Sequence, residues 1–493
     1  MPRTAPTRLQ HGPLTVYLAQ RRGHPDLAAL ARAVGPARPL VWLDTARSHP
    51  VTGRWSLLGV DPWLTLTARG EQLELHTSEA TRVWRAHPLH ALRQLLARYR
   101  TPSTPRIKLH SASGVAGRAL GLLGFLSYDL NRLIEPKLRQ PQPSGSAVPD
   151  MTWYGMTSLV LADHLLQRHW LISVVDPHAP RREGHREALE GLERLEAWLK
   201  PEPAGLRVDA DGAPSPMALE ATSTRAEFER MARRALEHIR AGDIFQANVA
   251  QRFTAPWQGD PLALYLRLRQ INPSPFACYL ESESLAVASC SPERLVRVQD
   301  GQVDTRPIAG TRPRGSSPEE DAVRSLELLL SDKERAEHIM LVDLARNDMG
   351  RVCTAGSVAV NDLMALEGYS HVIHIVSDVA GALRPGADAV DVIRAVFPGG
   401  TITGCPKVRC MQILRELEPV ARGLYTGSIG TLGFDGAMDL NIAIRTITVD
   451  RPRRRLEFHV GAGIVADSDP AREYDETLAK AGALMEAVHA TAG

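Results

Sequence analysis

A hairpin signal near the C-terminal end of the chain constrains the fold more than any other feature. Residues 426–434 and 438–449 are two β-rich runs, and the turn-forming pair Asp435-Gly436 lies between them. In the second run, apolar residues alternate with other residues, as in a strand with one buried face. The two runs therefore predict antiparallel strands and favour antiparallel sheets over a parallel wound sheet.

Further strands and helices are predicted along the chain. Strands, with turns in the longer segments, are expected within 39–45, 120–130, 159–175, 245–253 and 455–466. Helices are expected at about 181–199, 319–330, 332–347, 387–396, 406–417 and 470–489. Helices interspersed among antiparallel strands indicate an α+β fold.

One segment has the composition of a linker. Residues 201–222 are rich in Pro, Gly, Ala and Asp and show no sustained periodicity. They divide the chain into an N-terminal region, 1–200, and a C-terminal region, 223–493. The second region opens with Thr224 and Glu227, which form the capping box of a helix that we expect to stop at Gly242.

Charge and cysteine content exclude several classes of protein. The 493 residues include 58 Lys and Arg and 56 Asp and Glu, so the formal net charge is 58 − 56 = +2. This balance gives no electrostatic footprint for nucleic acid. We expect no signal peptide and no membrane helix, because no long apolar run is present. The five Cys form no C-x-x-C pair, which argues against a zinc site or a disulfide framework and favours a cytoplasmic protein.

Two glycine-rich segments match nucleotide-binding motifs only in part. Residues 459–466 fit G-x-G-x-x-A, but no helix follows directly and too little chain remains for a second βαβ half. Residues 399–407 lack the G-K-[ST] ending of a phosphate-binding loop. Their glycines precede Pro406, the expected first residue of a helix that carries Lys407 and Arg409. This arrangement is either an anion cradle at a helix N-terminus or an ordinary loop.

Two pairs of carboxylates could bind a metal ion. Glu334 and Glu337 are three residues apart in one predicted helix, so they share a helix face. Glu473 and Glu476 have the same spacing in another helix. Four converging carboxylates would suit Mg²⁺, which takes oxygen ligands. Each pair alone is more often a solvated helix face, and Ser331 with Glu334 also fits a capping box.

Two other polar residues lie in apolar surroundings. Arg445 is expected in the middle of a strand, where its guanidinium needs an anionic partner. That partner is either a substrate anion or a structural carboxylate. His374, in the run HVIHIVS, is more often a hydrogen-bonded core histidine than an acid or base.

Seven long motifs occur in one order between residues 224 and 487. They are SPERLV (291–296), RPIAGTRPRG (306–315), DKERAEHIMLVDLARND (332–348), YSHVIHIVS (369–377), FPGGTITGCPKVR (397–409), GSIGTLGFDGAMDLNIAIRT (427–446) and GAGIVADSDPAREYDET (461–477). Together they resemble the chorismate-utilising enzymes, the family of anthranilate synthase component I, aminodeoxychorismate synthase component I and the isochorismate synthases. Three N-terminal segments resemble the amino-transferring members: GRWSLLGVDP (53–62), GFLSYDL (124–130) and VPDM (148–151).

The resemblance implies the chorismate-binding fold, with two largely antiparallel β-sheets flanked by helices and the active site between them. It implies that Glu293 is the general acid that protonates the departing C4 hydroxyl group and that His374 lies beside the reacting ring. The implied Mg²⁺ ligands are Glu334, Glu337, Glu473 and Glu476. The residues implied around the carboxylates and ring of chorismate are Gly310, Thr311, Thr401, Tyr425, Arg445, Gly463 and Lys480. These roles agree with the chemistry, because two carboxylates need cations and N–H donors and hydroxide leaves poorly without an acid.

Gln246 bears on the nucleophile. In the isochorismate and salicylate enzymes, a lysine at the aligned position activates water. Glutamine is not a base, so ammonia is favoured over water. No glutaminase module with a nucleophilic cysteine is visible in the chain, so we expect a separate glutamine amidotransferase subunit to supply the ammonia.

The position of amination is predicted from several scattered features. Asn248 and the runs GGTITG and GSIG resemble the aminodeoxychorismate branch, which makes 4-amino-4-deoxychorismate for p-aminobenzoate and folate synthesis. The WLDT stretch (42–45) differs from the LLES motif that binds inhibitory tryptophan in anthranilate synthase. Ala309 matches the anthranilate branch, because many aminodeoxychorismate synthases have a lysine there. We expect the para product, with anthranilate synthesis and a non-catalytic subunit as the alternatives.

Overall fold

The computed structural model describes residues 5–36, 38–46, 53–102, 111–138, 146–200, 217–315, 317–368 and 372–491. Its α-helices are α1 (Leu27–Val34), α2 (Pro88–Arg98), α3 (Ala112–Ala119), α4 (Asn131–Ile134), α5 (Arg181–Trp198), α6 (Arg225–Arg240), α7 (Pro261–Ile271), α8 (Pro318–Leu330), α9 (Asp332–Gly350), α10 (Ala389–Val396), α11 (Lys407–Leu417) and α12 (Pro470–Thr491). Short 3₁₀ helices are η2 (Tyr128–Leu130), η3 (Pro136–Leu138) and η4 (Gly400–Ile402). The helices predicted from the sequence are confirmed to within a few residues at their ends.

The strands form one hydrogen-bonded network that divides into two sheets. In pairing order, the first sheet contains β1 (Thr7–His11), β2 (Leu14–Arg22), β9 (Arg168–Val174), β8 (Met151–Asp163), β4 (Trp55–Arg69), β3 (Leu40–Asp44), β12 (Phe276–Glu281), β13 (Leu285–Ser291), β22 (Thr446–Asp450), β23 (Arg455–Ile464) and β11 (Gln246–Pro256). The short strands β10 (Glu220–Ala221) and β19 (Gly404–Cys405) pair with β11. Every pair is antiparallel, as expected.

The second sheet shares the long strands β4 and β8 with the first. It contains β6 (Thr81–Arg85), β5 (Gln72–Thr77), β4, β8, β7 (Gly121–Leu126), β20 (Ser428–Gly433), β21 (Met438–Asn441), β14 (Arg294–Gln299), β15 (Gln302–Thr305) and β18 (Val372–Ala382), which also pairs with β16 (Ile308–Pro313) and β17 (Ala359–Gly368). These pairs are antiparallel too, so the predicted fold class is confirmed.

The two sheets diverge at the ladder between β4 and β8. The first half of β4 pairs with β3 and its second half with β5, and a register shift separates the two halves at Pro62/Leu64. Asp61 has a φ of +55°, the left-handed conformation that accompanies such irregular strand geometry. This bend lets one strand belong to both sheets.

The chain also passes directly from one sheet to the other at two places in the C-terminal region. The first passage joins β13 to β14 and contains Glu293. The second joins β21 to β22 through residues 442–445. The sequence predicted one strand over 438–449, and this prediction is wrong because the strand is interrupted. Ile442 and Ala443 are both buried, and Arg445 has a φ of +50°, so the alternation of a half-buried strand ends at Asn441.

Strands of the N-terminal and C-terminal regions pair with one another. β3 pairs with β12, and β7 pairs with β20. The largest hydrophobic cluster likewise takes Phe125 and Trp153 from the first region and Ile393 and Leu432 from the second. Of the predicted linker, 201–216 lie outside the described residues, and Glu220–Ala221 form β10. The predicted region boundaries therefore stay predictions.

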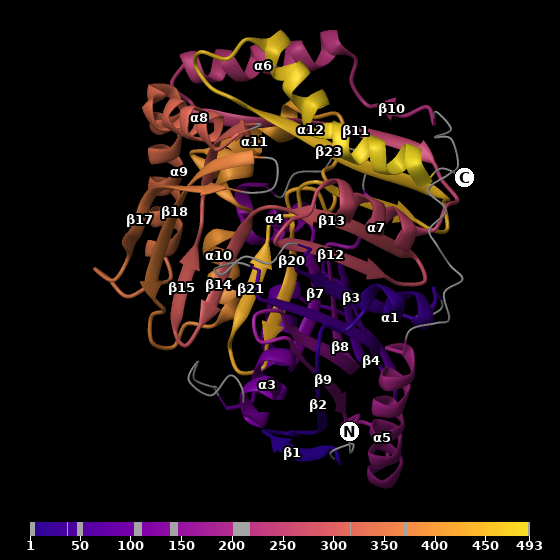
Figure 1. The fold of residues 1–493 in the computed structure, drawn as a ribbon. Helices are drawn as coiled ribbons and strands as arrows, with labels where there is room; N and C mark the ends of the chain where they lie inside the picture. The colour runs from indigo at the N-terminus through magenta and orange to yellow at the C-terminus, as the bar shows by residue number, and fades with distance from the viewer. Residues whose placement is uncertain are drawn as a thin grey trace.

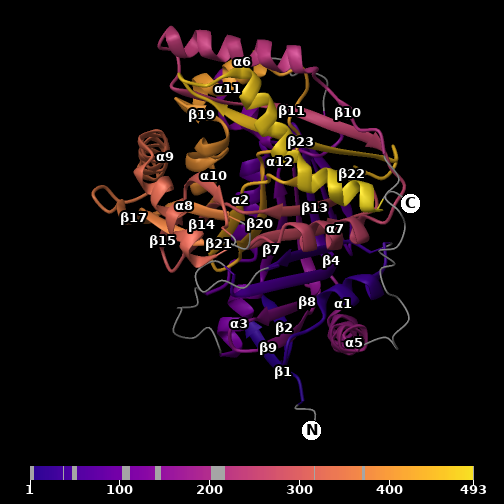
Figure 2. The same cartoon turned by 45° about the horizontal axis from the view of Figure 1, so that its top comes forward.

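Helices cover the outer faces of both sheets. α6, α11 and α12 lie over β11 and β23 (Figures 1 and 2), and α6 starts with the predicted capping box of Thr224 and Glu227. α9 packs on β16 and β18 at the other side of the molecule (Figure 1). None of the helices in the described ranges is long and apolar enough to span a membrane. All five cysteines are free thiols.

Close strand pairing in the second sheet predicts a stability effect. A Cβ atom added at Gly124 in β7 would lie 2.0 Å from the carbonyl oxygen of Thr152 in β8. Gly124→Ala should therefore lower the free energy of unfolding by about 1–3 kcal/mol, measured by urea denaturation. The matched control is Gly482→Ala in α12, where the added methyl group meets nothing within 4 Å. That change should raise stability by about 0.5–1 kcal/mol. Equal effects of the two changes would contradict this account of the β7–β8 contact.

Candidate active site

The side chain of Glu293 is buried at the first passage between the sheets. It is 6% exposed, and the Thr401 hydroxyl group in η4 donates a hydrogen bond to its Oε1 over 2.9 Å. Burial raises the pKa of Glu293 to about 8, and the hydrogen bond from Thr401 partly opposes this shift. The carboxyl group therefore carries a proton at neutral pH and can act as an acid.

Arg445 lies on the second passage, beside the first. Its Nη1 donates to Oδ1 of Asn272 over 3.1 Å, and in the part of the chain that the structure describes it makes no ion pair. Burial lowers its pKa from 12.5, so the guanidinium stays charged but poorly solvated. An uncompensated cation of this kind is costly and favours an anionic ligand. The structural carboxylate that the sequence left open as a partner is not found among the described residues.

His374 in β18 faces the same region. Its Nδ1 lies 3.4 Å from the carbonyl oxygen of Gly310 in β16. Burial lowers the pKa of His374 to about 4, and the charge of Arg445 contributes to this shift. The imidazole is therefore neutral at physiological pH and can exchange hydrogen bonds without adding charge.

One face of the β11–β23 ladder carries polar and small residues. Asn248 is directly opposite Gly463 in the register. A Cβ atom at Gly463 would lie 2.7 Å from Nε2 of Gln246, and a Cβ atom at Gly461 would lie 2.6 Å from Oδ1 of Asn248. Oε1 of Gln246 and Oδ1 of Asn248 are both buried and accept no hydrogen bond from the described residues. Two acceptors thus lack donors on one face of this ladder.

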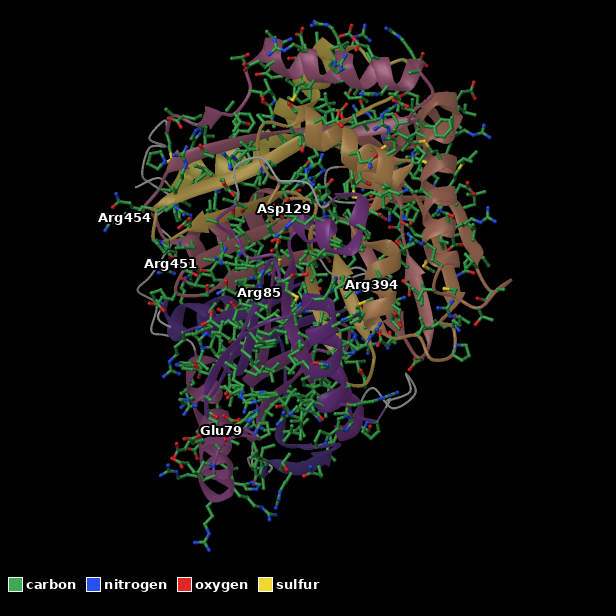
Figure 3. All side chains as sticks on the ribbon, turned by 180° about the vertical axis from the view of Figure 1, so that it is seen from behind. Glu79, Arg85, Asp129, Arg394, Arg451 and Arg454 are labelled. Atoms are coloured by element: carbon green, nitrogen blue, oxygen red, sulfur yellow. The ribbon has the colours of Figure 1, made fainter. Side chains whose placement is uncertain are left out.

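Tyr425 is fixed against this face by stacking. Its ring stacks on His459 with centroids 5.2 Å apart and 11° between the planes. Two residues before Tyr425, Gly423 donates its N–H to Oδ2 of Asp129 over 3.0 Å. Asp129 belongs to the N-terminal region. Asp129 is labelled near the middle of the molecule in Figure 3. The YDL segment of the N-terminal region thereby positions a residue of the candidate site.

The four predicted metal ligands each have another partner. On α9, Glu334 accepts from Nη1 of Arg312 over 3.1 Å, and Glu337 accepts from Nε2 of Gln246 over 3.2 Å. On α12, Ser468 donates to Glu473 over 2.7 Å, and Lys480 lies 2.7 Å from Glu476. The Lys480 ammonium also donates to the Gly461 carbonyl oxygen over 3.2 Å. Among the described residues, no three His, Cys, Asp or Glu side chains converge into a metal-binding group.

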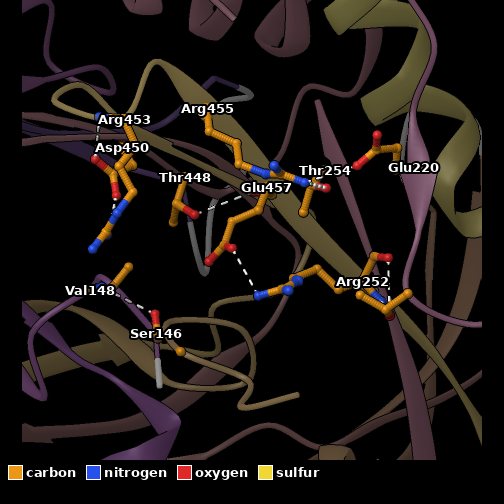
Figure 4. A network of polar contacts seen from close by, with 12 residues as sticks. Ser146, Val148, Glu220, Arg252, Thr254, Thr448, Asp450, Arg453, Arg455 and Glu457 are labelled. Carbon is orange, nitrogen blue, oxygen red and sulfur yellow. Dashed lines mark hydrogen bonds and ion pairs between the residues drawn. The ribbon is translucent and has the colours of Figure 1, made fainter. Parts of the chain in front are cut away.

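Two larger cavities lie away from these residues. One, of about 480 Å³, opens between α2, α3 and the turns that follow β14 and β20. The other, of about 460 Å³, lies at the far end of the β11–β23 ladder, where Arg252 donates to Glu457 over 3.2 Å (Figure 4). Size alone would select them as ligand sites. We place the candidate active site instead at the passages between the sheets, because the protonated acid and the unpaired guanidinium lie there.

Comparison with known proteins gives the family. The profile of chorismate binding enzymes matches residues 44–486. Anthranilate synthase component 1 of Synechocystis is 39% identical over 91% of this chain and 90% of its own length. Aminodeoxychorismate synthase component 1 of Bacillus subtilis is 40% identical over 91% of both chains. The crystal structure of anthranilate synthase component I from Streptococcus pneumoniae superposes with a TM-score of 0.75 at 33% identity, over 89% of this chain and 93% of that one.

The chain belongs to the chorismate-binding enzymes. It is a chorismate-utilising enzyme, and its relatives are named both anthranilate synthase component 1 and aminodeoxychorismate synthase component 1. Residues 459–464, the first part of the segment that partly matches G-x-G-x-x-A, form the end of β23. The next helix, α12, begins at Pro470, so no helix follows this segment directly.

At residues 399–409, the structure favours the ordinary loop over the anion cradle, the two alternatives that the sequence left open. Pro406 precedes α11 as its N-cap instead of being its first residue. Lys407 donates to Asp348 over 2.5 Å, and Arg409 donates to Asp243 over 3.0 Å, so both cations already have carboxylate partners. The loop contributes Thr401 to the site rather than its cations.

Several contacts of this chorismate-binding enzyme were missed by the sequence reasoning. Arg312, which contacts Glu334, lies in the RPIAGTRPRG motif but carried no separate signal. Asp348 and Lys407, which form a buried pair, lie in two different motifs and are 59 residues apart, so spacing along a helix or strand could not reveal their contact.

Thr311, one of the predicted substrate-binding residues, belongs to β16, but its side chain lies outside the described residues.

The raised pKa of Glu293 predicts that a neutral replacement stabilises the protein. In the unfolded chain this residue loses its proton near its ordinary pKa of 4.5, whereas in the folded chain it keeps the proton up to about pH 8. Folding is therefore penalised by about 1.4 kcal/mol per pH unit across this window, or about 3 kcal/mol at pH 7. Glu293→Gln should raise the free energy of unfolding by up to that amount at pH 7, with no gain below pH 4.5.

Urea denaturation between pH 4 and pH 8 measures this effect. The matched control is Glu319→Gln at the exposed start of α8, where hydrogen bonds from Ser317 and the backbone lower the pKa of the carboxyl group. That variant should gain no stability as the pH rises. A gain from Glu293→Gln that did not depend on pH would show that Glu293 is not a buried acid.

Proposed function

We propose that this enzyme aminates chorismate with ammonia to give 4-amino-4-deoxychorismate, a precursor of p-aminobenzoate. The observation that carries the proposal is that a protonated buried acid, Glu293, and a buried cation, Arg445, lie on adjacent passages between the sheets, and that Arg445 makes no ion pair among the described residues. Chorismate offers one group to each of them. It has a hydroxyl group that must leave and carboxylates that need a cation.

Glu293 supplies the proton for the departing group. The C4–O bond breaks, the oxygen takes the bonding electrons and the proton from Glu293, and it leaves as water. The hydrogen bond from Thr401 orients the carboxyl group toward one oxygen position. Arg445 binds a carboxylate of the substrate, and the neutral His374 approaches the ring without repelling that cation. Lys480 and the backbone around Gly463 complete the substrate contacts.

Gln246 and Asn248 favour ammonia as the nucleophile. Their amide oxygens are buried acceptors that receive no hydrogen bond from the described residues, and ammonia brings three N–H groups. Neither amide is basic enough to remove a proton from water, whereas neutral ammonia attacks without a base. We propose that the ammonia comes from a separate glutamine amidotransferase subunit and that the complex acts in the cytoplasm.

Anthranilate synthesis is the second candidate, and one residue favours it. Ala309, in β16, is 6% exposed and has no nucleophilic group, whereas a lysine there could add to the ring. Relatives with each activity have nearly the same identity to this chain, at 39% and 40%. We favour the para product for two reasons. Asn248 lies on the polar face of the β11–β23 ladder, and the run GGTITG contains Thr401, which donates a hydrogen bond to Glu293.

We further propose Mg²⁺ as the cofactor. The donor set fits this ion, because Glu334, Glu337, Glu473 and Glu476 offer only carboxylate oxygens, the ligands that a hard cation prefers. When bound, Mg²⁺ would neutralise and orient a substrate carboxylate. Two of these carboxylates, Glu334 and Glu476, form ion pairs with Arg312 and Lys480.

The reaction is tested with chorismate, Mg²⁺ and ammonium, with and without an added aminodeoxychorismate lyase. We expect p-aminobenzoate only when the lyase is present, and anthranilate fluorescence in neither case. Glutamine should not replace ammonium for the chain alone, and should do so once an amidotransferase subunit is added. Anthranilate formed without the lyase would establish the second candidate, and a lack of chorismate consumption would refute both.

The metal assignment is tested by calorimetric titration with Mg²⁺. Glu337→Gln should weaken binding at least about 10-fold, because one charged ligand is lost from a small set. Glu327→Gln, a carboxylate on the neighbouring helix α8, is the control and should bind Mg²⁺ as the wild type does. If both variants bind equally well, these glutamates are not the ligands.

A further inference from the structure

The buried ion pair of Asp348 and Lys407 lies near Glu293, the proposed acid, and has no role in the proposed reaction. Lys407 at the start of α11 donates from Nζ to Oδ2 of Asp348 over 2.5 Å and to the carbonyl oxygen of Val396 over 2.9 Å. Both side chains are 9% exposed. Burying two charges costs more free energy than packing apolar side chains of the same size, so such a pair calls for an explanation beyond stability.

A small cavity is lined both by Glu293 and by Asp348 of this pair. Its volume is about 30 Å³, which is enough for one water molecule. The other polar side chains that line it are those of Arg294, Thr305 and Thr401. A buried water commonly makes about three hydrogen bonds, and these side chains offer enough partners.

The proposed reaction creates a need for such a connection. Glu293 gives up one proton in every turnover. While substrate or product occupies the proposed site, the side of Glu293 that faces the substrate is closed to solvent. A second route, from the side on which Asp348 lies, would allow Glu293 to be reprotonated before the next turnover.

We propose that Asp348 and Lys407 return the proton to Glu293 through a water molecule in this cavity. This inference rests on the proposed function, in which Glu293 protonates the leaving hydroxyl group. The Glu293 carboxylate takes a proton from the water, and the water takes one from the Asp348–Lys407 pair. The pair, whose side chains are each 9% exposed, then regains a proton from solvent. The proton that ammonia loses on forming the amine leaves to solvent through the substrate cleft, so charge and atoms balance.

The electrostatics of the pair suit this role. Burial raises the pKa of Asp348 and lowers the pKa of Lys407, and their mutual attraction opposes both shifts. The proton affinities of the two groups are thereby brought closer together than in water. A proton can therefore move from the ammonium to the carboxylate, and onward to the water, at a smaller free-energy cost than between exposed groups.

Rapid-quench kinetics of Asp348→Asn test the proposal. Glu293 is protonated before the first turnover, so the first turnover should proceed within about 2-fold of the wild-type rate. Later turnovers should slow at least about 10-fold, at the low end of what a positioned proton-transfer group contributes. The matched control is Asp343→Asn on the same helix, where the side chain is 75% exposed, and both of its rates should equal those of the wild type.

A further measurement separates proton return from slow product release. Imidazole buffer, added at constant pH, should speed the later turnovers of Asp348→Asn, because a small protonated base can enter and recharge Glu293. It should leave the wild type unchanged. If the first and later turnovers fall together, or if neither changes, Asp348 has only a structural role and the proposal is wrong.

A second variant covers the case in which Asp348→Asn leaves Lys407 unpaired and the protein fails to fold. The double change Asp348→Asn with Lys407→Met removes both charges and should keep a cooperative thermal transition. It should show the same fast first turnover and slow later turnovers. Failure of the proposed function would appear differently, as a wild-type protein that consumes no chorismate.

Discussion

The candidate site depends on two strand-to-strand passages that are hydrogen-bonded to each other. The N–H of Ile442 on one passage donates to the carbonyl oxygen of Glu293 on the other over 3.0 Å. The N–H of Cys290 donates to the carbonyl oxygen of Arg445 over 3.1 Å, and Ser291 adds a side-chain bond to Ile442 over 2.6 Å. Neither passage can shift without breaking buried hydrogen bonds, so the acid and the cation keep their separation.

The same burial that fixes these groups also sets their chemistry. Removal from water makes Glu293 hold its proton and keeps His374 neutral, and Arg445 is buried with no carboxylate partner in the part of the chain that the structure describes. Each of these states costs folding free energy, which the apolar core of the two sheets must offset. Buried groups with shifted pKa values cluster at functional sites. A protein that did not use them in its activity could replace them with apolar residues and lose no function.

Most elements of the fold could be predicted from the sequence because their signals are local. The helix at Thr224 has its capping box within four residues, and the turn at Asp435-Gly436 lies between its own strands. The break at residues 442–445 escaped prediction because alternation describes one strand and carries no information about a change of sheet. The motifs assign Glu293, Arg445 and His374 to one candidate site, and this assignment stays a prediction. The Asp348–Lys407 contact joins residues far apart in sequence, and only the packing of α9 against the start of α11 places them together.

The sharing of strands between the two halves of the chain has a consequence for synthesis on the ribosome. β3 and β7 are complete long before their partners β12 and β20 have been made. Until then, their free edges expose backbone donors and acceptors to any other extended chain. The N-terminal half therefore cannot reach its final form as a separate unit during translation, and folding must wait for nearly the whole polypeptide. A nascent chain of this kind exposes unpaired strand edges for longer than one whose domains close in order, and such edges favour aggregation during synthesis.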